Sequence, residues 1–146
     1  MKVVFLDVDG VLATWDTIRR DRKKPGPYGF DRGCVERLNE ILHRSGAQLV
    51  LSSTWRIIHS LDEFNAHARS QGVTASVISA TPSLGTVRGK EIKAWLLEHP
   101  EVDKYAIIDD DSDMDDIKSH LIHVKNGMEK GLQDKHVAEA LSLLAD

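Results

Sequence analysis

Two aspartates, Asp7 and Asp9, directly follow the apolar run Val3–Leu6 near the start of the chain. Residues two apart in an extended segment point to the same side, so the two carboxylates are expected to lie close together. Carboxylates at such a separation repel each other, and either one of them holds a proton or a cation lies between them. A hard cation with oxygen ligands, such as Mg²⁺, fits this pair. The pattern therefore predicts a magnesium site that includes Asp7 and Asp9.

Further acids and hydrogen-bond donors follow two later apolar runs. Asp109 and Asp110 follow one of them, and Ser52 and Ser53 follow the other. Lys90 stands at the beginning of a predicted helix, from which its amine can reach inward. Magnesium screens the charge of a phosphate from an acidic nucleophile, and the amine and hydroxyl groups can bind the phosphate oxygens. The set predicts phosphoryl transfer through a covalent aspartyl phosphate.

Other interpretations of these residues are open. Lys90 can also be an ordinary exposed helix lysine, and Arg56 can contact a substrate phosphate or form a surface ion pair. An EF-hand loop starting at Asp109 is excluded, because its sixth position needs Gly and its twelfth needs Glu. Those positions hold Met114 and His120.

The candidate residues stand at the ends of apolar runs that are typical of buried strands. The predicted strands are Val3–Leu6, Gln48–Leu51, Ala75–Ser79, Tyr105–Ile108 and Leu121–Val124. Helical patterns separate these runs, which predicts an α/β fold with a five-stranded, mainly parallel sheet and right-handed crossovers. Ligands of such sheets bind beyond the carboxyl ends of the strands. We therefore expect Asp7, Ser52 and Asp109 to share one edge of the sheet.

Four helices are predicted between and after these strands. The apolar spacing of Cys34–Leu42 predicts the first, with Gly46 as its C-terminal cap. Ser60–Glu63 is a capping box that begins the second. Ile92–Leu96 and Val137–Leu144 mark the third and the fourth.

The stretch 13–30 lacks a clean period and contains Pro and Gly, which predicts a loop or short insertion after the first aspartates. Its aromatic residues are Trp15, Tyr28 and Phe30, and its charged residues are Arg19, Arg20, Arg22, Lys23 and Lys24 against Asp16 and Asp21. Basic residues with aromatics can hold a phosphate backbone and stack a base. A solvated loop explains the same composition, and both interpretations stay open.

These motifs resemble those of the haloacid dehalogenase (HAD) superfamily of phosphatases. The first motif is Asp7–Leu12, the second is Ser52 or alternatively Ser53, the third is Lys90, and the fourth is Ile107–Asp110. The resemblance implies a three-layer Rossmann-like fold with a minimal cap, formed by one domain over residues 1–146. It also implies Mg²⁺-dependent hydrolysis of a phosphomonoester.

The roles of individual residues follow from this resemblance. Asp7 would be the nucleophile, and Asp9 the general acid for the leaving group and then the base that activates water. Asp7, the backbone carbonyl of Asp9 and an acid of the fourth motif would bind Mg²⁺; Asp110 is the preferred ligand, and Asp109 would then pair with Lys90. The residues expected to contact the phosphate are Ser52, Ser53, Lys90 and Arg56.

Within the superfamily, the segments Leu51–Arg56 and Ile107–Asp111 resemble a small branch, the domain of Swiss Army Knife RNA repair proteins. This branch implies a nucleotide or a nucleic-acid terminal phosphate as the substrate. The alternatives are a phosphatase for sugars or other small metabolites, and a non-catalytic module that binds phosphate or nucleic acid. A phospho-acceptor signalling domain is excluded, because it needs an aspartate after its third strand, where this chain has Ser79 and Ala80.

Composition sets further expectations for the 146-residue chain. Its net charge of −4 is mild and says nothing about the fold. Cys34 is the one cysteine, which excludes an intrachain disulfide and favours a cytoplasmic protein. The first apolar run is too short for a signal peptide or a membrane span. No membrane association and no obligate protein partner are expected.

Overall fold

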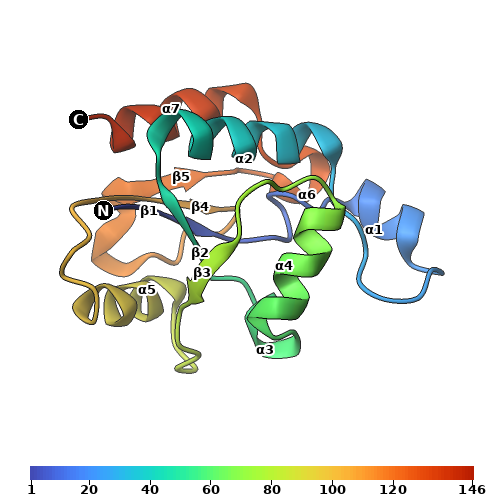
Figure 1. Ribbon diagram of the computed structural model, residues 1–146, viewed down its shortest axis with the longest axis horizontal. Helices are drawn as coiled ribbons and strands as arrows, with labels where there is room; N and C mark the ends of the chain where they lie inside the picture. Colours follow the sequence, from blue (N-terminus) through green and yellow to red (C-terminus); the bar gives the residue numbers. More distant parts are fainter.

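The computed structural model describes all residues 1–146, and its centre is a five-stranded sheet (Figure 1). The strands are β1 Lys2–Leu6, β2 Gln48–Leu51, β3 Val77–Ala80, β4 Lys104–Asp109 and β5 Leu121–His123. Their order is β3-β2-β1-β4-β5, and every neighbouring pair is parallel. The predicted α/β class and the parallel sheet are confirmed.

Strand β1 lies at the centre of the sheet and is buried on both faces. Val3, Val4, Phe5 and Leu6 are at most 1% exposed. Val4 and Leu6 belong to the larger apolar cluster, whereas Val3 and Phe5 belong to the smaller one on the other face. Burial on both faces explains why the strand is a continuous apolar run rather than an alternating one.

Helices cover both faces of the sheet. Helices α2 (Arg32–Ser45) and α7 (Asp134–Leu144) lie side by side on one face, and α5 (Arg88–Leu97) covers the other (Figure 1). Helix α4 (Leu61–Ser70) adds Phe64 and Ala68 to the larger cluster. These layers form the three-layer arrangement that the family resemblance implies.

The predicted helix ends are confirmed where a cap specifies them. Gly46 ends α2 in a left-handed conformation, with φ of 73°. Ser60 accepts a hydrogen bond from the Glu63 amide, and the Glu63 carboxylate accepts one from the Ser60 amide. Such reciprocal bonds satisfy amides that the first helical turn leaves without partners.

Four short helical elements have no counterpart in the sequence prediction. They are α1 Trp15–Asp21, α3 Trp55–Ile58, the 3₁₀ helix η1 Asp115–His120 and α6 Gly127–Lys130. Each has only four to seven residues, so none repeats an apolar pattern over two full turns. The stretch 13–30 is therefore an insertion that contains a helix, not only a loop.

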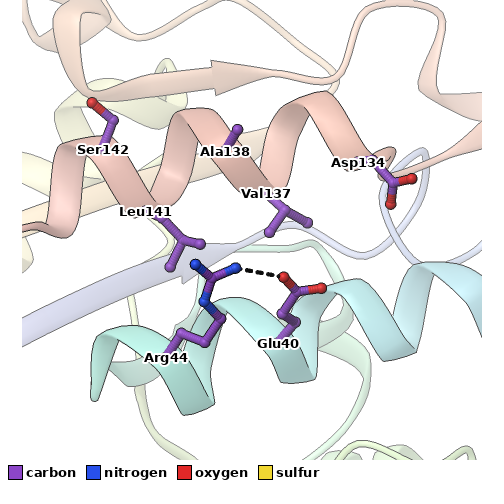
Figure 2. A pocket seen from close by; sticks show the side chains of 7 residues that line it. All are labelled: Glu40, Arg44, Asp134, Val137, Ala138, Leu141 and Ser142. Carbon is purple, nitrogen blue, oxygen red and sulfur yellow. Dashed lines mark hydrogen bonds and ion pairs between the residues drawn. The ribbon is translucent and has the colours of Figure 1, made fainter.

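A groove between α2 and α7 lies on the helical surface (Figure 2). Val137 and Leu141 line it, and an ion pair of 2.8 Å joins Arg44 to Glu40 at its edge. The groove contains none of the predicted site residues. No helix of the structure combines the length and apolar character needed to cross a membrane.

Candidate active site

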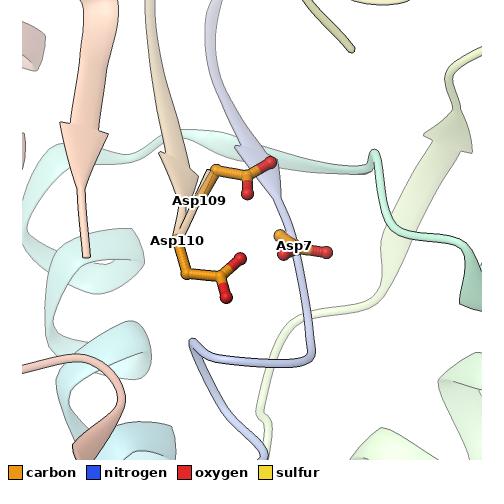
Figure 3. Close-up of side chains that lie close together, drawn as sticks. All are labelled: Asp7, Asp109 and Asp110. Atoms are coloured by element: carbon orange, nitrogen blue, oxygen red, sulfur yellow. The ribbon is translucent and has the colours of Figure 1, made fainter. Parts of the chain in front are cut away.

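The carboxylates of Asp7, Asp109 and Asp110 meet at the carboxyl edge of the sheet (Figure 3). Strands β1 and β4 pair with Leu6 opposite Ile108, and the Asp7 amide donates to the Ile108 carbonyl at 3.0 Å. One oxygen from each of the three carboxylates lies within 4.8 Å of the others. The parallel register thus brings together acids that are about a hundred residues apart in the chain.

Burial makes this acidic cluster electrostatically unfavourable without a cation. Asp7 is 7% exposed and Asp109 is fully buried. Burial raises the pKa of Asp7 to about 6; the Arg88 charge opposes this rise and the neighbouring Asp110 adds to it. Burial and then the charge of Asp7 raise the pKa of Asp109 as well. Oxygen-only donors at this spacing fit a hard divalent cation, which would relieve the repulsion.

Arg88, which was not among the predicted site residues, is the cation that contacts this cluster. Its Nη1 lies 3.0 Å from Asp7 Oδ1 and 2.9 Å from Asp109 Oδ2. The predicted pair of Asp109 with Lys90 is therefore wrong: α5 begins at Arg88, and Lys90, two residues further around the helix, is exposed. In the sequence, Arg88 and Lys90 flank Gly89, and either could face the acids. The sequence does not place the start of the helix to within two residues, so it does not distinguish between them.

A close backbone contact fixes the position at which α5 begins. The Gly89 amide donates to the Asp113 carbonyl at 3.1 Å, and a Cβ at Gly89 would collide with the backbone of Met114. The Asp113 carboxylate lies 3.4 Å from the Arg88 amide. Asp113 therefore fixes the start of α5, which in turn positions Arg88. It does not belong to the acidic cluster.

Ser52 and Ser53 lie at the end of β2, next to the acids. The Ser52 amide donates to the Leu6 carbonyl at 2.9 Å, which ties this turn to β1. Both serines are fully buried, but only the Ser53 hydroxyl has a partner, the Trp55 amide. The Ser52 hydroxyl has no hydrogen-bond partner. A buried hydroxyl without a partner is costly unless a ligand binds it, so Ser52 is the better candidate for phosphate binding.

Arg56 is buried and holds two loops together, so neither of its predicted roles applies. Its side chain is 6% exposed and pairs with Glu91 at 3.0 Å. The guanidinium also donates to the carbonyls of Ser53 at 2.7 Å and Thr81 at 2.9 Å. Its donors are therefore occupied by the protein, and Arg56 supports the Ser52 turn from behind.

Asp9 does not join the acidic cluster. Its Oδ1 accepts hydrogen bonds from the Tyr28 hydroxyl at 2.6 Å and from the Trp55 Nε1 at 3.2 Å. Its backbone carbonyl accepts no hydrogen bond from the protein and stays available as a ligand. Neither Tyr28 nor Trp55 was predicted to contact an acid, because no local pattern connects them to Asp9.

Gly10 allows the turn after Asp9 to pass close to Asp110. Its φ is +82°, and a Cβ at this position would collide with the Asp110 carboxylate. Gly127 also has no room for a side chain, because a Cβ there would collide with the Gly10 carbonyl and with Asp110. Glycine at both positions keeps the Asp110 side chain close to Asp7.

The charges of the insertion are largely paired within it. Asp21, only 8% exposed, pairs with Arg20 at 2.7 Å and with Lys24 at 3.1 Å, and it accepts the Gly29 amide. Arg19 lies 3.4 Å from Asp16. The basic character predicted from composition is therefore smaller in the folded protein than in the sequence.

One of three comparisons with known proteins gives a match. A family model described as the HAD domain in Swiss Army Knife RNA repair proteins matches residues 3–137, which is most of the chain. The comparisons with curated proteins and with solved structures give no match.

We expect Asp7→Asn to stabilise the metal-free protein at neutral pH. Between the ordinary carboxyl pKa of 3.8 and about 6, the folded protein keeps a proton on Asp7 that the unfolded chain has lost. Wild-type stability therefore falls as the pH rises through this window. The neutral amide avoids this loss, on the order of 1–3 kcal/mol at ~1.4 kcal/mol per pKa unit. Urea unfolding in a chelator at about pH 5 and pH 7.5 measures the difference.

Asp116→Asn is the matched control, because a hydrogen bond from Lys93 lowers the pKa of this exposed carboxyl group. It is ionised at both pH values in the folded and the unfolded chain, so the stability of this variant relative to wild type should not change between them. An equal difference between wild type and Asp7→Asn at both pH values would contradict the electrostatic account.

Replacing Arg56 with Lys should destabilise the protein by about 2–4 kcal/mol, because Glu91 and several carbonyls lose their partner in a buried site. The urea midpoint measures this loss. Arg32→Lys is the control: that arginine is 92% exposed in a pair with Glu36, and we expect a change below about 0.5 kcal/mol. An unchanged midpoint for Arg56→Lys would show that its buried contacts do not hold the two loops.

Proposed function

Because the chain belongs to the HAD domains of Swiss Army Knife RNA repair proteins, we propose that it is a magnesium-dependent phosphomonoester hydrolase. The observation that carries the proposal is the contact of Asp7 with Arg88 beside the acidic cluster. It provides a nucleophile, a cation for the phosphate oxygens and a site for a metal within one small region. Such a combination is what transfer of a phosphoryl group to an acid requires.

Asp7, Asp110 and the backbone carbonyl of Asp9 would hold Mg²⁺. Both oxygens of Asp109 are already engaged, one by Arg88 and the other by the Asp111 amide. Asp110 is partly exposed and accepts no such donor, so it is the better ligand. When bound, Mg²⁺ would neutralise charge on the phosphate and orient it toward Asp7.

In the first half of the reaction, a carboxylate oxygen of Asp7 attacks phosphorus and the bond to the leaving oxygen breaks. Asp9 donates its proton to that oxygen, so the leaving group departs as an alcohol. Arg88 and the Ser52 hydroxyl donate hydrogen bonds to the phosphate oxygens as their charge redistributes. The product is a mixed anhydride on Asp7.

In the second half, the Asp9 carboxylate takes a proton from water, and the resulting hydroxide oxygen attacks phosphorus. The bond between phosphorus and Asp7 breaks, which releases inorganic phosphate and restores the carboxylate. Asp9 is protonated again and ready for the next substrate. The same residue thus acts as acid and then as base, and no external reactant is consumed except water.

Wild-type protein should release inorganic phosphate from an aryl phosphate with Mg²⁺, and a chelator should abolish the release. Asp7→Asn should lower kcat/KM by at least about 100-fold, because it removes the nucleophile. Asp103→Asn, on a side chain 68% exposed at the other end of β4, is the control and should keep wild-type activity. Full activity in Asp7→Asn or in chelator would refute the mechanism.

For the substrate, we favour a nucleic-acid terminal phosphate over a sugar or other small metabolite. A hollow of about 610 Å³ has no apolar lining residue, and Lys125, Lys130 and Lys135 contribute to its wall. None of the three lysines forms an ion pair in the protein. Asn126 and Glu129 also line the adjoining hollow that contains Asp110. A polynucleotide with its terminal phosphate at Asp7 could place further phosphates over these lysines.

This basic surface is formed by residues that follow β5, and not by the charged residues of the insertion, although α6 contacts α1. The insertion keeps only Arg22 and Lys23 without ion pairs. Binding by the lysines and binding by the insertion predict different effects of substitutions. A module that binds nucleic acid without turnover would bind oligonucleotides but release no phosphate.

Charge reversal of Lys125, Lys130 and Lys135 to Glu should raise the KM for a 3′-phosphorylated oligonucleotide by at least about 10-fold. It should also make KM less dependent on salt, by ~0.7 in log–log slope for each phosphate that the variant no longer binds. The KM for a mononucleotide should stay nearly unchanged. A triple variant with Arg44→Glu, Arg69→Glu and Lys118→Glu, on exposed side chains that do not line this hollow, controls for the equal change in net charge.

Arg22→Glu with Lys23→Glu tests the insertion in the same assay. A larger effect there than in the lysine triple variant would assign nucleic-acid binding to the insertion. Equal KM values for oligonucleotides and mononucleotides in the wild type would favour a small-metabolite phosphatase.

A further inference from the structure

Two hydrogen-bond donors converge on a single oxygen of Asp9. The Tyr28 hydroxyl lies 2.6 Å from Asp9 Oδ1 and the Trp55 Nε1 lies 3.2 Å from the same atom. Oδ2 of Asp9 receives no hydrogen bond from the protein. The two oxygens of this carboxyl group therefore have different surroundings, and only Oδ2 is left without a hydrogen-bond partner.

Tyr28 reaches Asp9 because the insertion is fastened to α4. The Tyr28 carbonyl lies 2.8 Å from His67 Nε2, so this ring nitrogen donates to it. The neighbouring Phe30 amide donates to Gln71 Oε1 at 3.0 Å. These contacts hold the backbone on both sides of Gly29, and they connect the insertion to a helix of the main fold.

The two donors also hold each other in place. The Tyr28 and Trp55 rings meet edge to face, with centroids 5.2 Å apart at 88°. Trp55 is 4% exposed and stacks on His67 at 5.7 Å. The side chains that surround Asp9 Oδ1 are therefore rigid.

We propose that Tyr28, together with Trp55, is a positioning residue that fixes the Asp9 carboxyl group so that Oδ2 carries and transfers the proton. This inference rests on the proposed function. Two donors stabilise negative charge on Oδ1, which leaves Oδ2 as the oxygen that is protonated. They also stop rotation of the carboxyl group, so Oδ2 keeps its direction toward the leaving group. The insertion thus contributes to catalysis without contacting the substrate.

If Tyr28 positions the proton on Asp9, the loss of activity without Tyr28 should depend on the leaving group. A strongly activated phenol departs without a proton, whereas an alkoxide needs one in the transition state. Loss of positioning should therefore harm reactions with poor leaving groups and spare those with good ones. Damage to the fold alone would lower the rates of all substrates by the same factor.

The experiment compares kcat/KM of wild type and Tyr28→Phe over a series of phosphates, from nitrophenyl to phenyl to alkyl. This parameter covers the steps through formation of the phosphorylated Asp7 and excludes its later hydrolysis. We expect a loss of about 10- to 100-fold for the alkyl phosphate and less than about 3-fold for the nitrophenyl phosphate. Tyr105→Phe is the matched control, since that tyrosine stacks on His120 and its hydroxyl has no hydrogen-bond partner; it should match wild type throughout.

A double-mutant cycle separates positioning from damage to the fold. Tyr28→Phe should have no further effect in Asp9→Asn, because the proton it positions is gone. An equal loss for all substrates, no loss for the alkyl phosphate, or an additive loss in Asp9→Asn would overturn the inference while leaving the proposed function intact. If Asp7→Asn retains full activity, the proposed function fails, and the inference fails with it.

Discussion

The rest of the structure depends on how it accommodates three carboxylates at the buried carboxyl edge of the sheet. Asp7, Asp109 and Asp110 lie within a few ångströms of each other, and such a group is stable only when bound protons or a nearby positive charge offset the repulsion. Arg88 supplies part of that charge by contacting Asp7 and Asp109 together. The charge that remains is what a divalent cation would neutralise in the proposed function. The same repulsion would then both weaken the metal-free fold and favour binding of the metal.

The rest of the architecture keeps these charges in place. The parallel register of β1 and β4 sets the acids side by side, and the contact of Gly89 with Met114 sets where α5 starts and hence where Arg88 lies. Arg56 performs a comparable task on the other side, since it joins the Ser52 turn to the loop after β3. Arg56 is a structural support, whereas Arg88 contacts the acidic cluster itself.

The insertion after the first motif separates two acids that the sequence places together. Asp7 points into the metal cluster, whereas the aromatic pair of Tyr28 and Trp55 holds Asp9 away from it. In the proposed mechanism, this separation lets one acid act as a nucleophile and the other exchange protons. A full cap domain is not needed for it, because a segment of fewer than twenty residues, fastened to α4, provides the contact.

By itself, the sequence determined the class of the fold, the strand ends that carry Asp7, Ser52 and Asp109, and the family, because apolar runs closed by polar motifs are local signals. Only the tertiary structure decided which basic residue faces the acids. Arg88 and Lys90 are nearly equivalent in sequence, and the helix start that distinguishes them depends on a backbone contact 25 residues away. The partnership of Tyr28 with Asp9 was likewise invisible in the sequence, because it arises from packing between segments that no local pattern connects.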